Sequence, residues 1–299
     1  MKYVAAIDVG GTAIKAALVS QELEVINSIS VATPQGDSTG VETARAIAEI
    51  SERLSESAPV SAIGFAVPGT LTEDQGISRW TGNLGWKDLP IREILKSQVN
   101  LPVAFGHDVR VGALAELHSG AARKFQQSIF IPIGTGIAAA LIIDGKIRSS
   151  DGYAGEIGHI NVGHEMECVC GFTGCLEAIS SASAISREYL RRTGIRLSAK
   201  EILNRARSDD HAWQVWEQAI AYLVVALEDL ITILAPEAII FGGGLSQAGD
   251  LLLKPLKSLV EEHLTFQRKP EFLIAHYGVE AGTIGCALIA LELLGSGQK

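Results

Sequence analysis

The chain has 299 residues, of which 47% are hydrophobic and 20% are charged, and its formal net charge at pH 7 is −9. This length and composition predict two globular domains with a large buried core. The acidic balance, without any cluster of Lys and Arg, argues against a nucleic-acid partner.

The sequence also bears on where the protein resides. Its first ten residues have the pattern of a strand, not of a basic and then apolar leader peptide. The longest strongly apolar stretch, Ala219–Leu234, is interrupted by Glu228 and Asp229 and is too short to span a bilayer. We therefore expect a cytoplasmic protein with no membrane partner, and a total of only 4 cysteines agrees with a reducing compartment.

The first predicted element is a strand, a glycine turn and a second strand. The apolar run Tyr3–Val9 leads into Gly10-Gly11-Thr12, and another strand-like run follows. The pattern returns after the apolar run Ser128–Ile133, where Gly134–Leu141 matches Gly11–Leu18 at six of eight positions. Glycines have no Cβ and let backbone N–H groups approach a ligand, so the two hairpins predict a site that holds a polyphosphate from both sides. Two unrelated β-hairpins are the alternative.

The segments between these hairpins alternate between helical and strand-like patterns. We predict a helix over Val41–Ser57, a strand over Ser61–Val67 that ends at Pro68-Gly69, a loop over Thr81–Trp86, a strand over Pro102–Phe105 and a helix over Val109–Ser119. No low-complexity linker appears, so the repeated hairpin places the domain boundary near Gly120.

Asp108 follows the last of these strands and precedes the last helix. Its carboxylate either caps the helix or faces a cleft. An aspartate at the end of a strand is suited to take the proton from an alcohol during phosphoryl transfer. Position and residue type alone favour the capping role.

Three of the four cysteines lie within eight residues, at Cys168, Cys170 and Cys175, and His159 stands nine positions before the first. Three thiolates and one imidazole make a closed tetrahedral zinc set, and a metal without an open position is structural. Buried or disulfide-bonded cysteines without a metal are the alternative.

His159 is the predicted fourth ligand because it shares a turn with Glu156 in the pattern Glu-x-x-His. His164 and Glu167 lie close by in sequence and remain alternatives. A metal-pinned loop would aim the two flanking carboxylates, Glu156 and Glu177. Carboxylates held in fixed directions can accept hydrogen bonds from the vicinal hydroxyls of a sugar.

A third glycine site lies near the C-terminus. A helix over His211–Leu234 and a buried strand over Ala238–Phe241 lead into Gly242-Gly243-Gly244, and a helical pattern over Leu251–Leu264 follows. This layout is typical of nucleotide contact, with a plain tight turn as the alternative. A helix rich in small residues, Thr283–Leu294, closes the chain.

Taken together, these motifs resemble the ROK family of sugar kinases, repressors and related proteins over essentially the whole chain. The motifs that carry the resemblance are Asp8-x-Gly10-Gly11-Thr12-x-x-Lys15, Pro68-Gly69, Asn83-Leu84-x-Trp86, Asp108, Gly134-Thr135-Gly136, Glu156-x-Gly158-His159, Cys168-x-Cys170-Gly-x-x-Gly-Cys175-x-Glu177 and Gly242-Gly243-Gly244. The glutamate–histidine and cysteine motifs in this order are highly specific, and the glycine motifs are supportive.

The resemblance implies an α/β protein with the actin-like, ribonuclease H-like ATPase fold, in which two α/β domains surround a central cleft. The implied domains are residues 1–119 and 120–282, with a zinc-binding loop at 159–177. A C-terminal helix at about 283–299 would pack back on the first domain.

The resemblance also implies an activity, the ATP-dependent phosphorylation of a hexose at its 6-hydroxyl, with Asp108 as the general base. The residues implied to contact the sugar are Gly69, Asn83, His107, Asp108, Glu156, His159 and Glu177. Those implied to contact ATP and magnesium are Asp8, Gly10, Gly11, Thr12, Lys15, Gly134, Thr135, Gly136, Gly242, Gly243 and Gly244. Asp8 would place the magnesium through water, and His159 would offer one ring nitrogen to zinc and the other to the sugar.

One residue departs from the family pattern. Many members have Asn before the catalytic Asp, where this chain has His107. Imidazole is bulkier than an amide and cannot offer the paired donor and acceptor of one flat group, so the set of sugar hydroxyls that is recognised can differ. Glucose is the first expected substrate, and N-acetylmannosamine, N-acetylglucosamine and fructose are alternatives because their kinases share the Glu-x-x-His pattern.

Two other functions compete with a kinase. A sugar-sensing regulator of this family usually carries an N-terminal helix-turn-helix module, and the glycine hairpin that begins at residue 8 leaves no room for one. An inactive sugar-binding protein is suggested by His107, although Asp108, Lys15 and both hairpins are kept. Family members are commonly dimers or tetramers, so a homodimer or homotetramer is expected.

Overall fold

A computed structural model of the chain describes residues 2–296, which form two compact units. Unit 1 holds the chain up to His118, the segment Ser149–Tyr153 and the chain from Glu280 onward, and unit 2 holds Ser119–Arg148 and Ala154–Val279. This differs from the expected division, which assigned every residue from 120 to 282 to one domain. The segment Ser149–Tyr153 belongs to unit 1 because its backbone packs directly against that unit. A Cβ placed on Gly152 would lie only 1.9 Å from the carbonyl oxygen of Leu71.

The main sheet of unit 1 has the strand order β3-β2-β1-β4-β8. Its strands are β1 (Tyr3–Val9), β2 (Ala13–Ser20), β3 (Val25–Ala32), β4 (Val60–Val67) and β8 (Val103–His107). β2 is antiparallel to β1 and β3, whereas β4 is parallel to both β1 and β8. The carboxyl ends of β1, β4 and β8 therefore share one edge of the sheet.

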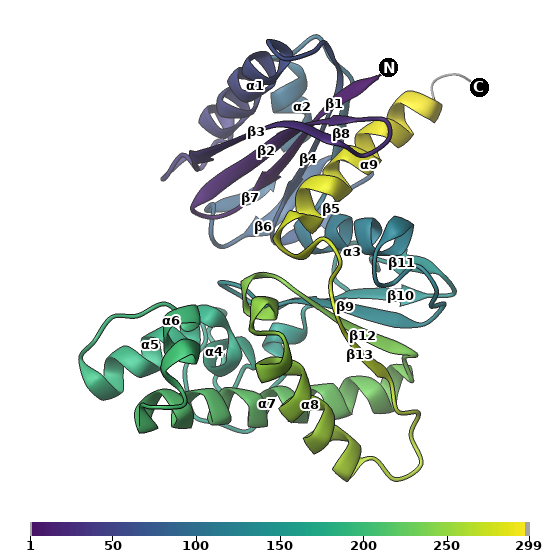
Figure 1. The fold of residues 1–299 in the computed structure, drawn as a ribbon. Helices are drawn as coiled ribbons and strands as arrows, with labels where there is room; N and C mark the ends of the chain where they lie inside the picture. The colour runs from purple at the N-terminus through teal and green to yellow at the C-terminus, as the bar shows by residue number, and fades with distance from the viewer. Residues whose placement is uncertain (1, 297–299) are drawn as a thin grey trace. The chain divides into compact units, whose positions relative to one another are not determined.

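Alternate residues of β1 enter two different cores, as the period-2 geometry of a strand requires. Ile7 packs with the apolar face of α1 (Val41–Ser55), whereas Ala6 packs with α9 (Ala281–Ser296). The two helices therefore cover opposite faces of the sheet (Figure 1). The other helices of unit 1 are α2 (Ile91–Lys96) and α3 (Asp108–Ser119), and along the chain the 3-10 turn η3 (Gly278–Glu280) leads from unit 2 into unit 1.

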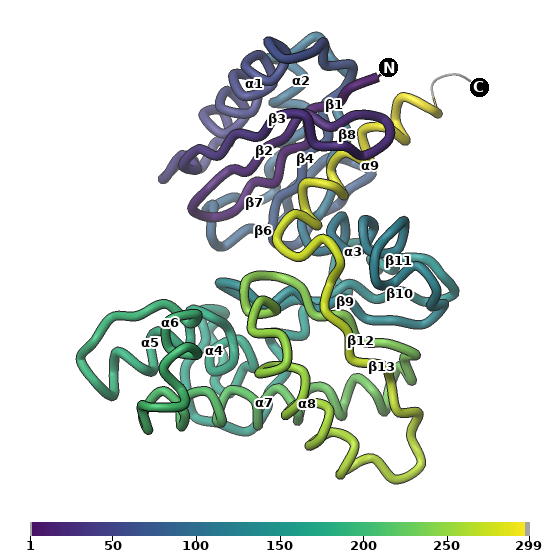
Figure 2. The backbone as a smooth tube through the Cα atoms, viewed as in Figure 1, coloured from purple at the N-terminus to yellow at the C-terminus, as the bar shows by residue number. Residues whose placement is uncertain are grey.

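The C-terminal helix α9 lies beside the N-terminal strands, from which it is separated by most of the sequence (Figure 2). Its small residues also allow close approach to α3, since a Cβ on Gly285 would lie 1.9 Å from the carbonyl oxygen of Val111. Among residues 2–296, Gly278–Ser296 is the single helical stretch that is long and apolar enough to cross a membrane. Of its apolar part, 39% is buried. Residues 297–299 of the expected helix lie outside the described residues.

A small sheet follows β4, with the order β5-β6-β7. Its strands are β5 (Thr70–Thr72), β6 (Ile77–Thr81) and β7 (Trp86–Leu89). The prediction of a loop over Thr81–Trp86 was wrong at its ends, which belong to β6 and β7. Strands of three to five residues are too short to give a clear alternating pattern.

Unit 2 repeats the sheet plan of unit 1, in the order β11-β10-β9-β12-β13. Its strands are β9 (Ser128–Pro132), β10 (Ala140–Ile143), β11 (Lys146–Arg148), β12 (Ala238–Gly242) and β13 (Glu271–Ile274). Its helices are α4 (Glu177–Ser180), α5 (Ala182–Thr193), α6 (Ala199–Arg205), α7 (Asp210–Leu234) and α8 (Asp250–His263), with the 3-10 turns η1 (Ile157–His159) and η2 (Gly244–Ala248). β9 and β10 are antiparallel, and β9, β12 and β13 are parallel, so β9 corresponds to β1.

The second glycine hairpin is more open than the sequence echo predicts. The expected strand directly after Gly136 begins only at Ala140. Two backbone N–H groups between these residues bond elsewhere: that of Ile137 donates to Glu177 Oε2 at 2.8 Å, and that of Ala139 donates to the Gly155 carbonyl at 2.7 Å. The intervening residues are therefore drawn away from regular pairing with β9.

Glu188, on α5, is an ionisable residue on which the stability of unit 2 should depend. Its carboxylate accepts hydrogen bonds from Arg191 and Arg192, at 2.7 and 2.6 Å from their Nε atoms, and the residue is 7% exposed. Hydrogen bonds from Arg191 first, and then from Arg192, lower the pKa of Glu188 to about 2. Burial favours the neutral carboxyl group and acts in the opposite direction. The folded-state pKa is thus below the unfolded value, so this stabilisation is complete above about pH 4.5 and fades as pH falls toward 2.

Glu188→Gln should therefore lower the free energy of unfolding by about 2 kcal/mol at neutral pH. Urea unfolding of the variant and the wild type between pH 7 and pH 3 measures this. The difference between the two proteins should shrink as pH falls below about 4.5. A difference that stays constant over that range would contradict the assignment of the pairing to the ionised carboxylate.

Candidate functional site

The first group of predicted residues gathers around the β1–β2 turn of unit 1. Gly10 donates its N–H to the Ala13 carbonyl at 3.0 Å, and its own carbonyl accepts the hydroxyl of Thr33 at 2.6 Å. Asp8 lies at the end of β1, directly opposite Lys15 on β2. Burial raises the pKa of the Asp8 carboxyl, and the positive charge of Lys15 acts in the opposite direction.

Asn83 lies beside this turn, and Gly69 contacts the end of β6, before the Asn83 loop. A Cβ on Gly11 would come within 3.0 Å of the Asn83 Cβ, so the β6–β7 loop touches the glycine turn. Gly69 has a φ of 97°, and a Cβ there would lie 2.3 Å from the Trp80 carbonyl, so the position admits no larger side chain. The hydroxyl of Thr81 donates to the Pro68 carbonyl at 3.0 Å and holds this turn against β6.

Asp108 begins α3, directly after β8. Its Oδ1 accepts the N–H of Val109, the next residue, at 2.7 Å, whereas a capping side chain usually accepts an N–H two or three residues further on. The Asp108 side chain is 31% exposed and is therefore accessible to a ligand.

His107 is a buried neutral residue, 3% exposed. Burial first, and then the nearby charge of Arg110, lower the pKa of its imidazole well below the usual value, while a hydrogen bond to the Gly69 backbone opposes this. Nδ1 accepts the N–H of Val109 at 3.2 Å, so the hydrogen bond to Gly69 uses the other nitrogen. The ring therefore joins the Gly69 turn to the start of α3.

The sequence analysis missed a residue that fastens both sides of Asp108. Glu73, in the β5–β6 turn, accepts the backbone N–H of His107 at 3.0 Å through Oε1. The same carboxylate pairs with Arg110 Nε at 3.3 and 3.2 Å, and the Arg110 side chain is 5% exposed. Glu73 lies 34 positions before His107 and 37 positions before Arg110, and no sequence motif connects these residues. The contact could therefore not be predicted from their spacing.

In unit 2, the second glycine turn and the third glycine site lie together. The N–H of Ile133 donates to the Gly242 carbonyl, and the N–H of Leu245 donates to the Ile133 carbonyl, both at 3.0 Å. Gly243 has a φ of 71° and contacts the Ile133 backbone. The strand ends that precede Gly134 and Gly244 are thus paired, as expected for two parallel strands that contribute to one ligand site.

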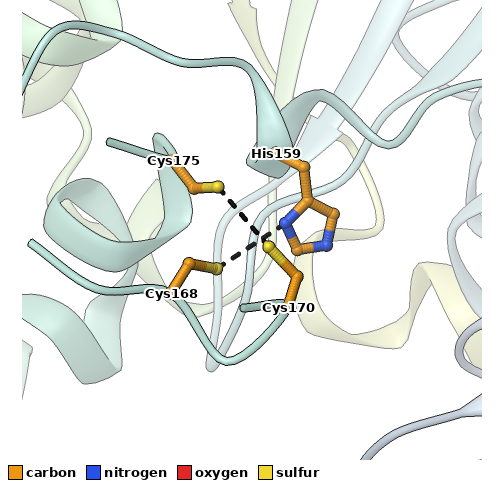
Figure 3. Close-up of side chains that lie close together, drawn as sticks. All are labelled: His159, Cys168, Cys170 and Cys175. Atoms are coloured by element: carbon orange, nitrogen blue, oxygen red, sulfur yellow. Dashed lines mark hydrogen bonds between the residues drawn. The ribbon is translucent and has the colours of Figure 1, made fainter. Parts of the chain in front are cut away.

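The predicted metal ligands come together on the loop that precedes α4. Figure 3 shows His159, Cys168, Cys170 and Cys175 around one point, with their ligand atoms within 4.8 Å of one another. His159 Nδ1 lies 3.7 Å from Cys168 Sγ, and the Sγ atoms of Cys170 and Cys175 are 3.6 Å apart. Two thiolates on one tetrahedral zinc are about 3.8 Å apart, given zinc–sulfur bonds of about 2.3 Å, so these distances fit such an ion. The cysteines are free and form no disulfide.

His164 cannot serve as the fourth ligand in this arrangement, because both of its ring nitrogens are used. Nδ1 accepts the N–H of Met166 at 3.0 Å, so Nε2 is the nitrogen that donates to the Cys175 carbonyl, also at 3.0 Å. Glu167 is exposed and pairs across the loop with Thr173. The geometry thus selects His159 from the three residues that spacing left open.

Burial opposes the ionisation of two of the three thiols. Burial raises the pKa of Cys175 to about 12 and also raises that of Cys168, whereas a hydrogen bond from the Phe172 backbone lowers the pKa of Cys170. Thiols at this separation do not ionise together without a nearby positive charge. Three thiolates and an imidazole are a donor set that zinc prefers.

The remaining predicted residues flank this loop. Glu156 precedes the η1 turn, where its carbonyl accepts the N–H of His159 at 3.1 Å, and Glu177 begins α4 two residues after Cys175. Both carboxylate residues are half-buried. Within unit 2, the structure therefore brings together the metal-ligand set, the flanking carboxylates and the second glycine turn.

A profile of the ROK family matches residues 4–293. The chain belongs to the ROK family. A glucokinase of Halalkalibacterium halodurans is 33% identical over 324 aligned positions, which cover 100% of this chain and 98% of that protein. The family resemblance predicted from the motifs is thereby confirmed.

Solved structures of ROK proteins share the fold. A ROK family glucokinase from Streptomyces griseus, solved in complex with glucose and AMPPNP, has a TM-score of 0.87 at 28% identity, covering 97% of this chain and 99% of that one. A ROK family transcriptional regulator, a homologue of the E. coli MLC protein, has a TM-score of 0.86 at 25% identity, covering 97% of this chain and 78% of that one. The predicted actin-like α/β fold is confirmed.

Proposed function

We propose that this ROK protein is an ATP-dependent sugar kinase that phosphorylates a hexose at its 6-hydroxyl, with glucose as the first candidate. The observation that carries the proposal is Asp108, an accessible carboxylate at the end of β8, in the same unit as a glycine turn that is suited to phosphate. The likeness to a glucokinase that was solved with glucose and AMPPNP supports both substrates.

Asp108 is the proposed general base. Transfer of a phosphoryl group to an alcohol requires a group that takes the hydroxyl proton as the new bond forms. Oδ1 is held by the Val109 N–H, and this fixes the direction of the carboxylate. His107 supports Asp108 and Gly69 through the backbone contacts of its ring, so its influence on the choice of sugar acts through these two neighbours.

The sugar is assigned to the polar residues that the family resemblance implies. Asn83 and Gly69 in unit 1, and Glu156, His159 and Glu177 in unit 2, are the proposed contacts. Carboxylates accept hydrogen bonds from vicinal hydroxyls, and an amide can both donate and accept. The Nε2 atom of His159 points away from the thiols in Figure 3, which leaves it for a sugar hydroxyl.

ATP is assigned to the three glycine segments, Gly10–Thr12, Gly134–Gly136 and Gly242–Gly244. The N–H groups of Gly10 and Gly134 donate to the carbonyls of Ala13 and Gly136, so other backbone N–H groups of these segments would bind phosphate oxygens and the adenosine side of the nucleotide. Asp8 would hold magnesium through water, and Lys15 would add positive charge beside the phosphates. Magnesium supplies charge neutralisation of the phosphoryl group when bound.

The proposed metal at His159, Cys168, Cys170 and Cys175 is a structural zinc ion. With four protein ligands it has no open position, so its role is to hold the loop between Glu156 and Glu177. We further propose a cytoplasmic homodimer or homotetramer without a nucleic-acid or membrane partner.

The rival function is sugar sensing, as in a ROK regulator. The likeness to the regulator related to MLC makes this a real alternative, because 78% of that chain matches the fold of this one. Retention of Asp108, Lys15 and both glycine turns favours the kinase.

A coupled assay of ADP release tests the proposal. Purified protein with MgATP should release ADP when glucose, mannose, fructose, N-acetylglucosamine or N-acetylmannosamine is added, and the rate should be highest with one of them. Release of ADP only at the rate seen without sugar, across all five, would favour the regulator or the inactive binding protein.

A further inference from the structure

Glu177 makes a contact that sugar binding does not require. Its Oε2 accepts the backbone N–H of Ile137 at 2.8 Å, directly after the second glycine turn. The carboxylate packs closely against the turn, since a Cβ placed on Gly136 would lie 2.3 Å from the same Glu177 oxygen. Among the described residues, no hydrogen bond to Oε1 is present, so the second oxygen is open to a ligand.

Besides a hydrogen bond within the turn, from the N–H of Gly134 to the Gly136 carbonyl at 3.0 Å, the glycine turn is held by α5, which follows in the chain. The N–H of Ala182 donates to the Gly134 carbonyl at 2.9 Å, and the hydroxyl of Ser183 donates to the Thr135 carbonyl at 2.5 Å. These two contacts fix carbonyl groups on one side of the turn. The Glu177 carboxylate is the contact that fixes an N–H group at its far end.

We propose that Glu177 is a positioning residue for the nucleotide, which it serves by holding the turn 134–136, in addition to its proposed contact with the sugar. The inference rests on the proposed function, because it takes this turn as the phosphate site. Its physical basis is that one carboxylate oxygen binds the turn while the other remains free. The identity of the sugar does not enter the argument.

The contact has a large expected effect because the acceptor is charged. Hydrogen bonds to ionised groups are stronger than those between neutral groups, and a half-buried N–H that loses its acceptor is left without compensation. The turn would then sample conformations in which its N–H groups no longer converge on the phosphates. An affinity loss of about tenfold for the nucleotide corresponds to one such hydrogen bond.

The test measures the affinity for AMPPNP with Mg²⁺ by calorimetry, in the absence of sugar, for Glu177→Ala and the matched control Glu156→Ala. Both variants lose a proposed sugar-binding carboxylate, and Glu177 is the one whose Oε2 accepts the N–H of Ile137 beside the turn. We expect Glu177→Ala to bind AMPPNP about tenfold more weakly than the wild type. Glu156→Ala should stay within about twofold, since it leaves the hydrogen bond from Ile137 to Glu177 in place.

Two further variants keep the test independent of folding. In Glu177→Gln the amide oxygen can still accept the Ile137 N–H, so its loss of AMPPNP affinity should be smaller than that of Glu177→Ala. Ser183→Ala removes a different contact to the turn and should weaken AMPPNP binding severalfold with an unchanged KM for sugar. Unfolding temperature and metal content are recorded for each variant.

Equal AMPPNP affinity of Glu177→Ala and the wild type would overturn the inference, and so would an equal loss in Glu156→Ala. The KM for sugar tests the proposed function separately. If both glutamate variants raise this KM but neither changes the AMPPNP affinity, the assignment of the sugar site is supported and the positioning role of Glu177 is refuted. If AMPPNP does not bind to the wild type, the assignment of the turn to the nucleotide fails first.

Discussion

Replacing Asp108 by alanine should lower kcat by about 10³-fold, the typical contribution of a positioned general base. The affinity for sugar should change only a few-fold, because binding and proton transfer are separate tasks of the site. Steady-state kinetics at saturating MgATP, together with sugar binding measured by calorimetry, give both quantities. Asp108→Asn should behave in the same way, since an amide cannot take the proton.

The matched control is Asp144→Asn. Asp144 lies in the exposed β10–β11 turn with a φ of 55°, a conformation that asparagine also tolerates. This control should retain the wild-type kcat. A kcat near the wild-type value in Asp108→Ala would remove Asp108 from the role of base and leave its contact with Val109 as a purely structural one.

Replacing Cys170 by serine should lower the zinc content of the purified protein well below one ion per chain. Three ligands hold zinc less tightly than four, and the two remaining thiols would be left close together without full neutralisation. The unfolding temperature should fall, and the KM for sugar should rise because the loop no longer aims Glu156 and Glu177. Elemental analysis and thermal unfolding measure the first two effects.

Cys286→Ser is the matched control for this experiment. Cys286 lies on α9 in unit 1, where its thiol donates to the Ile7 carbonyl at 3.2 Å, and it is not among the gathered ligand atoms. Its zinc content should equal that of the wild type. Unchanged zinc in Cys170→Ser would refute the ligand set, and equal zinc loss in both variants would show that the effect is general to cysteine replacement.

Local sequence patterns were sufficient where a single feature decides the structure. The apolar run of β1 followed by glycines predicts the strand and the turn, and Asp108 directly after β8 predicts the start of α3. The close spacing of the cysteines predicts a shared point, because so short a loop keeps its thiols near one another. The helices α7 and α8 also lie within a residue of their predicted ends, since long periodic patterns are the clearest signals.

Long-range contacts decided the rest. The pairing of Glu73 with His107 and Arg110 joins segments that no local pattern connects. The opening of the second hairpin depends on Glu177, which lies 40 positions away from Ile137. The choice of His159 over His164 depends on which ring nitrogens are already engaged, and this becomes visible only when the loop is folded.

The most direct test of the central claim is to identify the product of the sugar-dependent reaction. Purified protein is incubated with MgATP and the preferred hexose, and the phosphorylated position is determined by phosphorus and proton NMR. The account predicts a hexose 6-phosphate formed in equal amount with ADP by the wild type, and almost none formed by Asp108→Ala. Phosphate on another hydroxyl, or equal product from both proteins, would contradict it.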